Sequence, residues 1–101
     1  MKIDYKKQGD KLNISLKGEL DHHVATFVKE GLDGVIEENF AKEVIFDFSQ
    51  VTFMDSTGIG VLLGRYKVLK GKGADVFITN PNPTIDRLLK LSGIYSVIIK
   101  I

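Results

Sequence analysis

The chain has 101 residues, of which 44% are hydrophobic and 27% are charged, and its formal net charge is +1. This composition predicts one soluble globular domain, residues 1–101, and excludes disorder along the whole length. The small net charge gives little support to nucleic-acid binding, and the lack of cysteine excludes disulfides, thiolate catalysis and cysteine-ligated metal sites. No apolar run reaches the roughly 18–20 residues of a membrane span, and the first residues lack the apolar stretch of a secretory signal, so we expect a cytoplasmic protein.

The N-terminal segment has the pattern of a β-hairpin. Apolar and polar residues alternate on both sides of a turn signal at Gly9, which predicts strands over about 2–7 and 11–18. In the second strand the even-numbered positions are apolar and the odd-numbered positions are polar. This alternation predicts a strand with one face in the core and one face in water.

Two helices and a strand are predicted in the middle of the chain. Apolar residues at three- and four-residue spacing predict a helix over about 22–39, with Asp21 placed to cap it. The run 44–48 barely alternates, which favours a central strand covered on both faces. A loop over 49–55 then leads to a second helix over about 57–70.

The last third of the chain continues the alternation of strands and helices. A short buried strand is predicted at 76–78, followed by a proline-rich loop and a short helix over about 85–91 that Asn82 or Thr84 caps. A last strand is predicted at 97–101. The order β-β-α-β-α-β-α-β predicts an α/β fold with a mixed sheet, parallel in its middle, and helices packed on it.

A polar elbow, 55–57, joins the central strand to the second helix, and the enzyme motifs that could occur there do not match. The dinucleotide fingerprint G-x-G-x-x-G requires glycine where Leu63 stands. The nucleophile elbow G-x-S-x-G requires glycine where Met54 stands. A phosphate loop is also missing, so Ser56 lacks the usual setting of a catalytic serine.

Ser56 is nevertheless placed at a helix start. The free amides and the dipole there favour negative charge, so a phosphoserine would be tolerated at this position. The alternative is that Asp55, Ser56 or Thr57 is simply the N-cap of the helix, and the spacing alone favours this alternative.

Glycines inside the second predicted helix need an explanation, because each costs roughly 1 kcal/mol in a helix interior. Gly60 and Gly64 lie four residues apart and therefore share one helical face. A face of small residues lets another backbone approach closely. The alternative is that this face packs against the protein's own sheet.

Two other features give weak functional signals. His22 and His23 are adjacent, so in a helix their side chains point about 100° apart and cannot form a metal site without further ligands. The basic segment 65–72 carries one aromatic residue, but cations at a helix C-terminus are expected from the helix dipole. We therefore expect no metal and no nucleic-acid partner.

The stretch Phe48–Tyr66 resembles the signature of STAS domains, the family of anti-sigma factor antagonists, and the similarity extends over nearly the whole chain. Three segments resemble in particular the members that act in sporulation: Gly18–His23, Met54–Ser56 and Gly64–Lys67. The resemblance implies a STAS-like domain with an N-terminal hairpin, a mostly parallel mixed sheet and about three helices. The family commonly continues into a C-terminal helix, which this sequence lacks after Ile101.

The resemblance also implies a function. The protein would be a binding switch rather than an enzyme, without cofactor or metal, whose unphosphorylated form binds an ATP-bound anti-sigma factor and so releases the sigma factor. That anti-sigma factor would also be the serine kinase that modifies Ser56, and a metal-dependent serine phosphatase would reverse the modification. Asp21 would face the elbow from a neighbouring loop. The residues implied in partner binding are Asp21, Asp55, Ser56, Thr57, Gly58, Gly60, Gly64 and Arg65.

Two alternatives remain open at this point. Within the same family, the chain could serve a general-stress sigma pathway or a multi-component signalling complex instead of sporulation. In a different class, it could be a small nucleotide-binding protein that uses the Ser56 elbow as an anion site.

Overall fold

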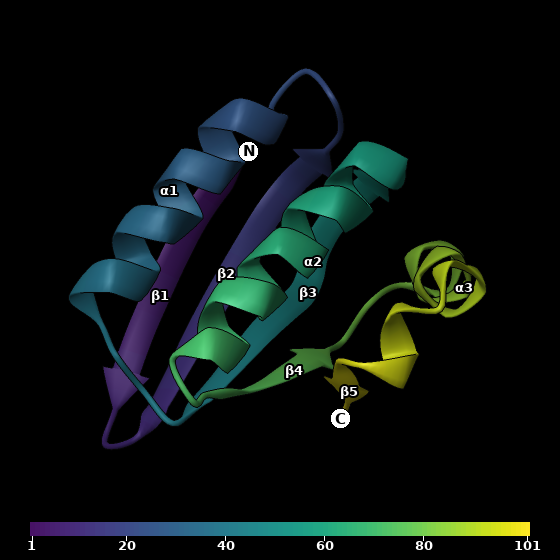
Figure 1. Ribbon diagram of the computed structural model, residues 1–101. Coiled ribbons are helices and arrows are strands. Elements are labelled where there is room, and N and C mark those ends of the chain that lie inside the picture. The colour runs from purple at the N-terminus through teal and green to yellow at the C-terminus, as the bar shows by residue number, and fades with distance from the viewer.

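The computed structural model describes residues 1–101 as five strands, three α-helices and one short 3-10 helix (Figure 1). The predicted order of strands and helices is confirmed, and the 3-10 helix is an addition to it. The elements, in chain order, are β1 (Lys2–Gln8), β2 (Lys11–Leu20), α1 (Ala25–Glu38), β3 (Glu43–Met54), α2 (Ser56–Gly71), β4 (Asp75–Thr79), α3 (Pro83–Ser92), η1 (Ile94–Ser96) and β5 (Ile99–Lys100).

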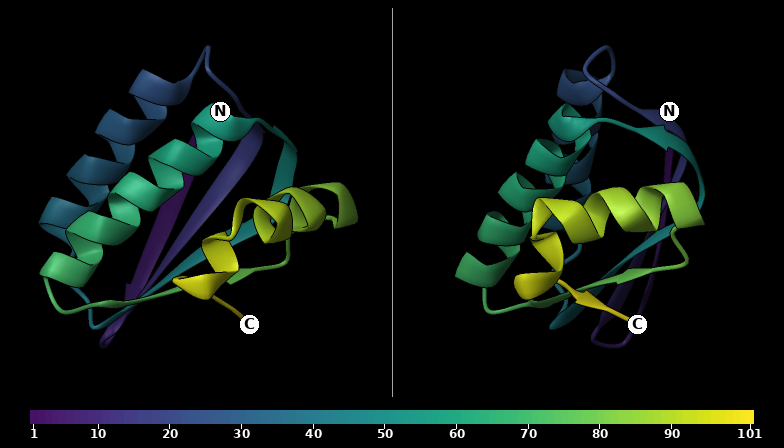
Figure 2. Two further views of the ribbon diagram at one scale, coloured as in Figure 1. Left: turned by 45° about the vertical axis from the view of Figure 1, so that its right-hand side comes forward. Right: turned by 90° about the vertical axis from the view of Figure 1, so that its right-hand side faces the viewer.

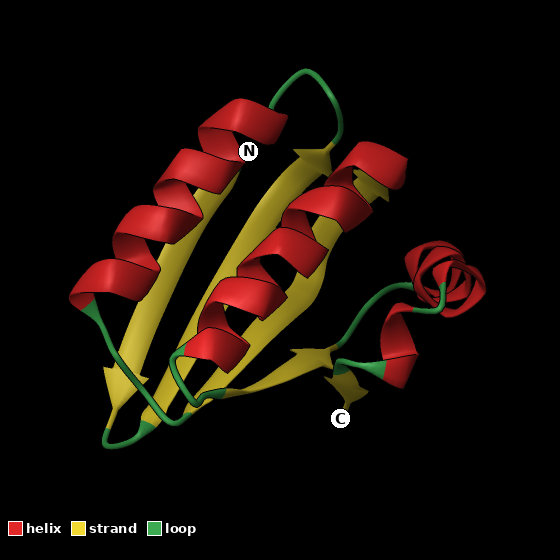
Figure 3. Ribbon diagram, viewed as in Figure 1, coloured by secondary structure: helices red, strands yellow, loops and turns green.

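The strands form one mixed sheet in the order β1-β2-β3-β4-β5. β1 and β2 are the antiparallel hairpin, whose turn contains Gly9 with a φ of 57°. The remaining neighbours are parallel, and a helix makes each crossover between them (Figure 3). The expected mixed, mostly parallel sheet is therefore confirmed.

α1 and α2 lie side by side over one face of the sheet, and α3 lies beside β4 and β5 (Figure 2). The apolar side chains of β2 point toward α1 and α2, and Leu12, Ile14 and Leu16 are at most 1% exposed. The polar side chains of β2 face the other way, as the alternation predicts. The core thus lies between the sheet and these two helices.

The interior of β3 differs from the prediction in how it is covered. Phe46 and Phe48 are fully buried beneath the helices, whereas Ile45 and Asp47 on the opposite face are only half-buried. Ile45 is covered there by its cross-strand neighbours, Asn13 and Phe77, rather than by a helix. The apolar and polar residues of this strand alternate little because neighbouring strands cover its second face, and not because a second layer of helices does.

β3 also continues to Met54 where the sequence predicts a loop over 49–55. Val51 and Met54 are both buried although they lie three residues apart, because the pairing with β2 shifts register twice along this stretch. Gly18, with a φ of 110°, lies at one of these irregularities. The extension matters for function because it brings the end of β3 level with the end of β2.

Helix boundaries differ from the predictions at two ends. α1 begins at Ala25 rather than at residue 22, and Val24 precedes it without a side-chain cap. The predicted cap, Asp21, instead accepts a hydrogen bond from the His23 N–H over 2.9 Å and stabilises the turn before the helix. α3 begins at Pro83 rather than at residue 85, and of its two predicted caps Asn82 takes the role, because its Oδ1 accepts from the Ile85 N–H over 2.9 Å.

The final strand is shorter than predicted because the N–H groups of Val97 and Ile98 donate back to the Ile94 carbonyl of η1. The hydroxyl of Tyr95 donates to Asp86 Oδ1 over 2.6 Å, and Lys100 Nζ lies 3.0 Å from the same oxygen. These contacts join η1 and β5 to α3. Burial and the hydrogen bond to Asp86 raise the pKa of Tyr95, and the hydrogen bonds from Tyr95 and Lys100 lower the pKa of Asp86. None of the helices has both the length and the apolar content needed to span a membrane.

Candidate functional site

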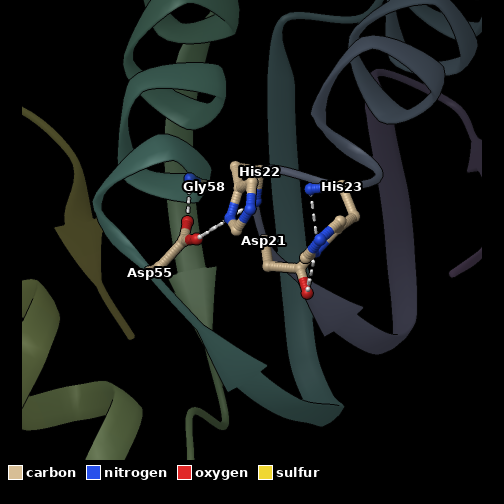
Figure 4. A network of polar contacts seen from close by, with 5 residues as sticks. All are labelled: Asp21, His22, His23, Asp55 and Gly58. Carbon is tan, nitrogen blue, oxygen red and sulfur yellow. Dashed lines mark hydrogen bonds and ion pairs between the residues drawn. The ribbon is translucent and has the colours of Figure 1, made fainter.

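The site is built where β2 and β3 end together. Leu20 pairs with Met54 in the parallel register, and the Asp55 N–H donates to the Leu20 carbonyl over 3.3 Å. Because both strands end at the same edge of the sheet, Asp21 and Asp55 leave it side by side. The turn before α1 and the first residues of α2 are therefore neighbours (Figure 4).

Asp55 is the cap of α2 and also the link to the turn beside it. Its Oδ1 accepts from the Gly58 N–H over 3.1 Å, and its Oδ2 accepts from the His22 N–H over 3.1 Å. The ring Nδ1 of His22 lies 3.3 Å from the same Oδ2. Desolvation would raise the pKa of Asp55, but the hydrogen bonds from Gly58 and His22 outweigh it and hold the pKa below its usual range.

Ser56 is released from the capping role by Asp55. It is the first residue of α2, it is exposed, and its hydroxyl makes no hydrogen bond to another group of the chain. Thr57 beside it is also exposed. Of the three residues considered for the N-cap, Asp55 takes that role, and the Ser56 hydroxyl is left free at a helix N-terminus.

The glycines of α2 have two different surroundings. A Cβ added to buried Gly58 would lie 2.6 Å from the Leu20 carbonyl oxygen and 2.9 Å from the Leu20 side chain, so only glycine lets α2 approach β2 this closely. A Cβ at Gly60 or Gly64 would meet nothing within 4 Å. The alternative that these two glycines pack against the protein's own sheet is therefore wrong.

Arg65 is positioned apart from the other predicted site residues. Its side chain is only 8% exposed, and its Nε lies 2.9 Å from Asp33 Oδ1 of α1, close enough for an ion pair although without hydrogen-bond geometry. It lies nine residues beyond Ser56, about 14 Å along the helix. The structure assigns Arg65 to the packing of α1 against α2 and does not bring it to the surface around Ser56.

Two histidines belong to the site although their spacing was considered only for a metal site, which it does not favour. His22 contacts Asp55, and the ring Nδ1 of His23 lies 3.6 Å from Asp21 Oδ2. The two rings are 3.9 Å apart between centroids and tilted by 37° (Figure 4). The partner of His22 is 33 residues away in the chain, so local spacing could not reveal this contact.

Comparison with known proteins gives consistent results. An anti-sigma F factor antagonist of Paenibacillus polymyxa is 34% identical over 97 residues, which are 96% of this chain and 83% of the relative. An anti-sigma-B factor antagonist of Bacillus subtilis is 27% identical over 95% of this chain and 86% of the relative.

Solved structures show the same fold. The anti-sigma factor antagonist SpoIIAA in its unphosphorylated form matches with a TM-score of 0.80 and 27% identity, over 99% of this chain and 88% of the other. The Bacillus cell fate determinant SpoIIAA in the phosphorylated form matches with a TM-score of 0.72, also at 27% identity, over 99% and 91%. The family model of the STAS domain matches residues 2–101. The chain therefore belongs to the STAS domain family.

Proposed function

We propose that this protein is an anti-sigma factor antagonist that is switched by phosphorylation of Ser56. The observation that carries the proposal is the free, exposed hydroxyl of Ser56 at the first position of α2, beside a capping residue that is not itself the switch. The similarity to relatives named as anti-sigma factor antagonists supports it, as does the match to one such protein in both unphosphorylated and phosphorylated forms.

The unphosphorylated protein binds the anti-sigma factor through a surface that we call the α2 docking face, made of Asp21, Ser56, Thr57, Gly60 and Gly64. Open space over Gly60 and Gly64 supports this assignment, because a partner backbone could approach the helix closely there. Gly58 and Asp55 shape the face from beneath, since the first lets α2 reach β2 and the second attaches the His22 turn. Binding releases the sigma factor from its inhibitor.

The anti-sigma factor also acts as the kinase. It transfers the γ-phosphoryl group of its ATP to the Ser56 Oγ, the hydroxyl proton is lost, and ADP is the other product. The phosphate adds nearly two negative charges beside the carboxylates of Asp21 and Asp55. Burying this charge against a partner is costly without matching cations, so the phosphorylated form binds weakly. A metal-dependent serine phosphatase restores the hydroxyl, and the protein is a substrate in this cycle rather than an enzyme.

The test is incubation with the anti-sigma factor and ATP, followed by intact-mass and peptide mapping. We expect one added phosphate on the peptide that contains Ser56. Ser56→Ala should accept no phosphate and should bind permanently, whereas Thr57→Ala should still accept one phosphate, on Ser56, whatever its rate. Phosphate on Thr57, or none on either residue, would refute the assignment.

We further propose that the pathway is sporulation. The identity to two anti-sigma F factor antagonists, 34% and 32%, is higher than that to the anti-sigma-B factor antagonists, 24–30%. Binding measured against both anti-sigma factors under the same conditions tests the choice. Tighter binding to the anti-sigma-B factor would assign the chain to the general-stress pathway and leave the Ser56 switch intact.

A further inference from the structure

His22 connects the turn that carries Asp21 to the start of α2. Its backbone N–H and its ring both contact Asp55, at 3.1 Å and 3.3 Å, while its side chain is 64% exposed. Ser56 directly follows Asp55 and is exposed as well. The imidazole is thus held against Asp55 (Figure 4), the residue that directly precedes the serine proposed to be modified.

Asp21 and Asp55 form ion pairs with histidines and with no lysine or arginine. Asp55 faces the ring from the junction of β3 and α2, and His23 and Asp21 face it from its own turn. A phosphate on Ser56 would add a dianion to a site that already holds two carboxylates. The imidazoles are therefore the cations that this network can supply. Of the two, His22 is the one that contacts Asp55, the residue next to Ser56.

We propose that His22 is the internal counter-cation of phosphate on Ser56, with its protonated ring placed between the phosphate and the Asp55 carboxylate. The inference rests on the proposed phosphorylation of Ser56. In this arrangement the turn 21–24 stays attached to α2 after modification instead of being repelled from it. The phosphorylated form loses its partner through charge on an otherwise retained surface.

The chemistry favours this pairing at cellular pH. A phosphoserine takes up its second negative charge near pH 6, and histidine in general becomes neutral close to the same pH. The two titrations are therefore coupled, and each displaces the other by the same amount. For unit charges about 6 Å apart across water, the displacement is about half a pH unit at low salt and about a quarter of a unit at 0.15 M ionic strength.

The experiment places phosphoserine at position 56 during translation, so no kinase is needed. Phosphorus NMR then follows the second ionisation of the phosphate in three proteins: the otherwise unchanged chain, His22→Gln and His23→Gln. The influence of the helix N-terminus is common to all three. We expect this ionisation to move to higher pH by about a quarter of a unit in His22→Gln at 0.15 M salt, and by clearly less in His23→Gln.

Equal ionisation in all three proteins would overturn the proposal, and a larger effect of His23→Gln would transfer the role to His23. A second measurement does not depend on any histidine variant. The ring protons of His22 should titrate at higher pH in the phosphorylated chain than in the unphosphorylated one, and unchanged titration also overturns the proposal.

This outcome is separate from that of the proposed function. If the anti-sigma factor fails to modify Ser56 while His22→Gln still shifts the ionisation of the phosphate, the kinase assignment is wrong and the pairing of His22 with the phosphate is right. If Ser56 is modified but His22 has no effect, only the present inference fails.

Discussion

Replacing the two open glycines of α2 by alanine should make the protein more stable and a weaker binder. A Cβ at Gly60 or Gly64 meets nothing within 4 Å, and neither residue has a positive φ. Each alanine should therefore stabilise the fold by about 0.5–1 kcal/mol through helix propensity alone. For a domain of this size the double variant should melt roughly 5–10 °C higher.

The same methyl groups should obstruct the partner if its backbone lies against this helix. Overpacking of a close contact costs about 1–3 kcal/mol, which corresponds to binding weaker by about 5- to 150-fold. The assays are urea or thermal unfolding followed by circular dichroism, and calorimetric titration with the anti-sigma factor.

Two matched controls come from the chain itself. Gly34 lies in α1 with nothing within 4 Å of an added Cβ, so Gly34→Ala should stabilise similarly and leave binding unchanged. Gly58→Ala should destabilise, because its Cβ would lie 2.6 Å from a backbone oxygen that cannot move easily. The reasoning is refuted if the double variant is not more stable, or if it binds as well as Gly34→Ala.

Three further outcomes are expected. Asp55→Ala should lower the free energy of unfolding by about 1–2 kcal/mol in urea, since the α2 cap is lost, while Ser56→Ala should change it by less than about 0.5 kcal/mol; equal effects would mean that Asp55 is not the cap. The pKa of Tyr95 is higher in the folded state than in the unfolded state, so its contribution to stability is complete below about pH 10 and is lost as the pH rises further. Tyr95→Phe should therefore flatten the alkaline part of a profile of unfolding free energy against pH, and an unchanged slope would contradict the contact with Asp86. Arg65→Ala should cost about 2 kcal/mol, because it removes packing and leaves Asp33 unpaired, yet phosphate transfer to the folded variant should proceed at the wild-type rate; slower transfer would place Arg65 in the partner contact.

The sequence by itself determined the types and order of the elements. Alternation in β2 and three- and four-residue spacing in α1 and α2 are local patterns, and they fix which face of each element is apolar before any long-range contact forms. The hairpin turn and the position of the α2 start were readable for the same reason, whereas the predicted cap of α1, Asp21, was wrong. Gly9 lies in the hairpin turn, and the helix start at residues 55–57 was visible from its polar side chains.

Only the tertiary structure decided which residue of the elbow does what. Asp55 became the cap and Ser56 became free because groups from β2 and the following turn, 33 residues away, complete the contacts of Asp55. The sequence equally could not distinguish Gly58, which faces the Leu20 carbonyl, from Gly60, which faces open space. It predicted a partner contact for Arg65, which the structure buries against Asp33. Local spacing sets which residues share a face, but the pairing of distant strands and helices sets what covers that face, and a switch depends on the second.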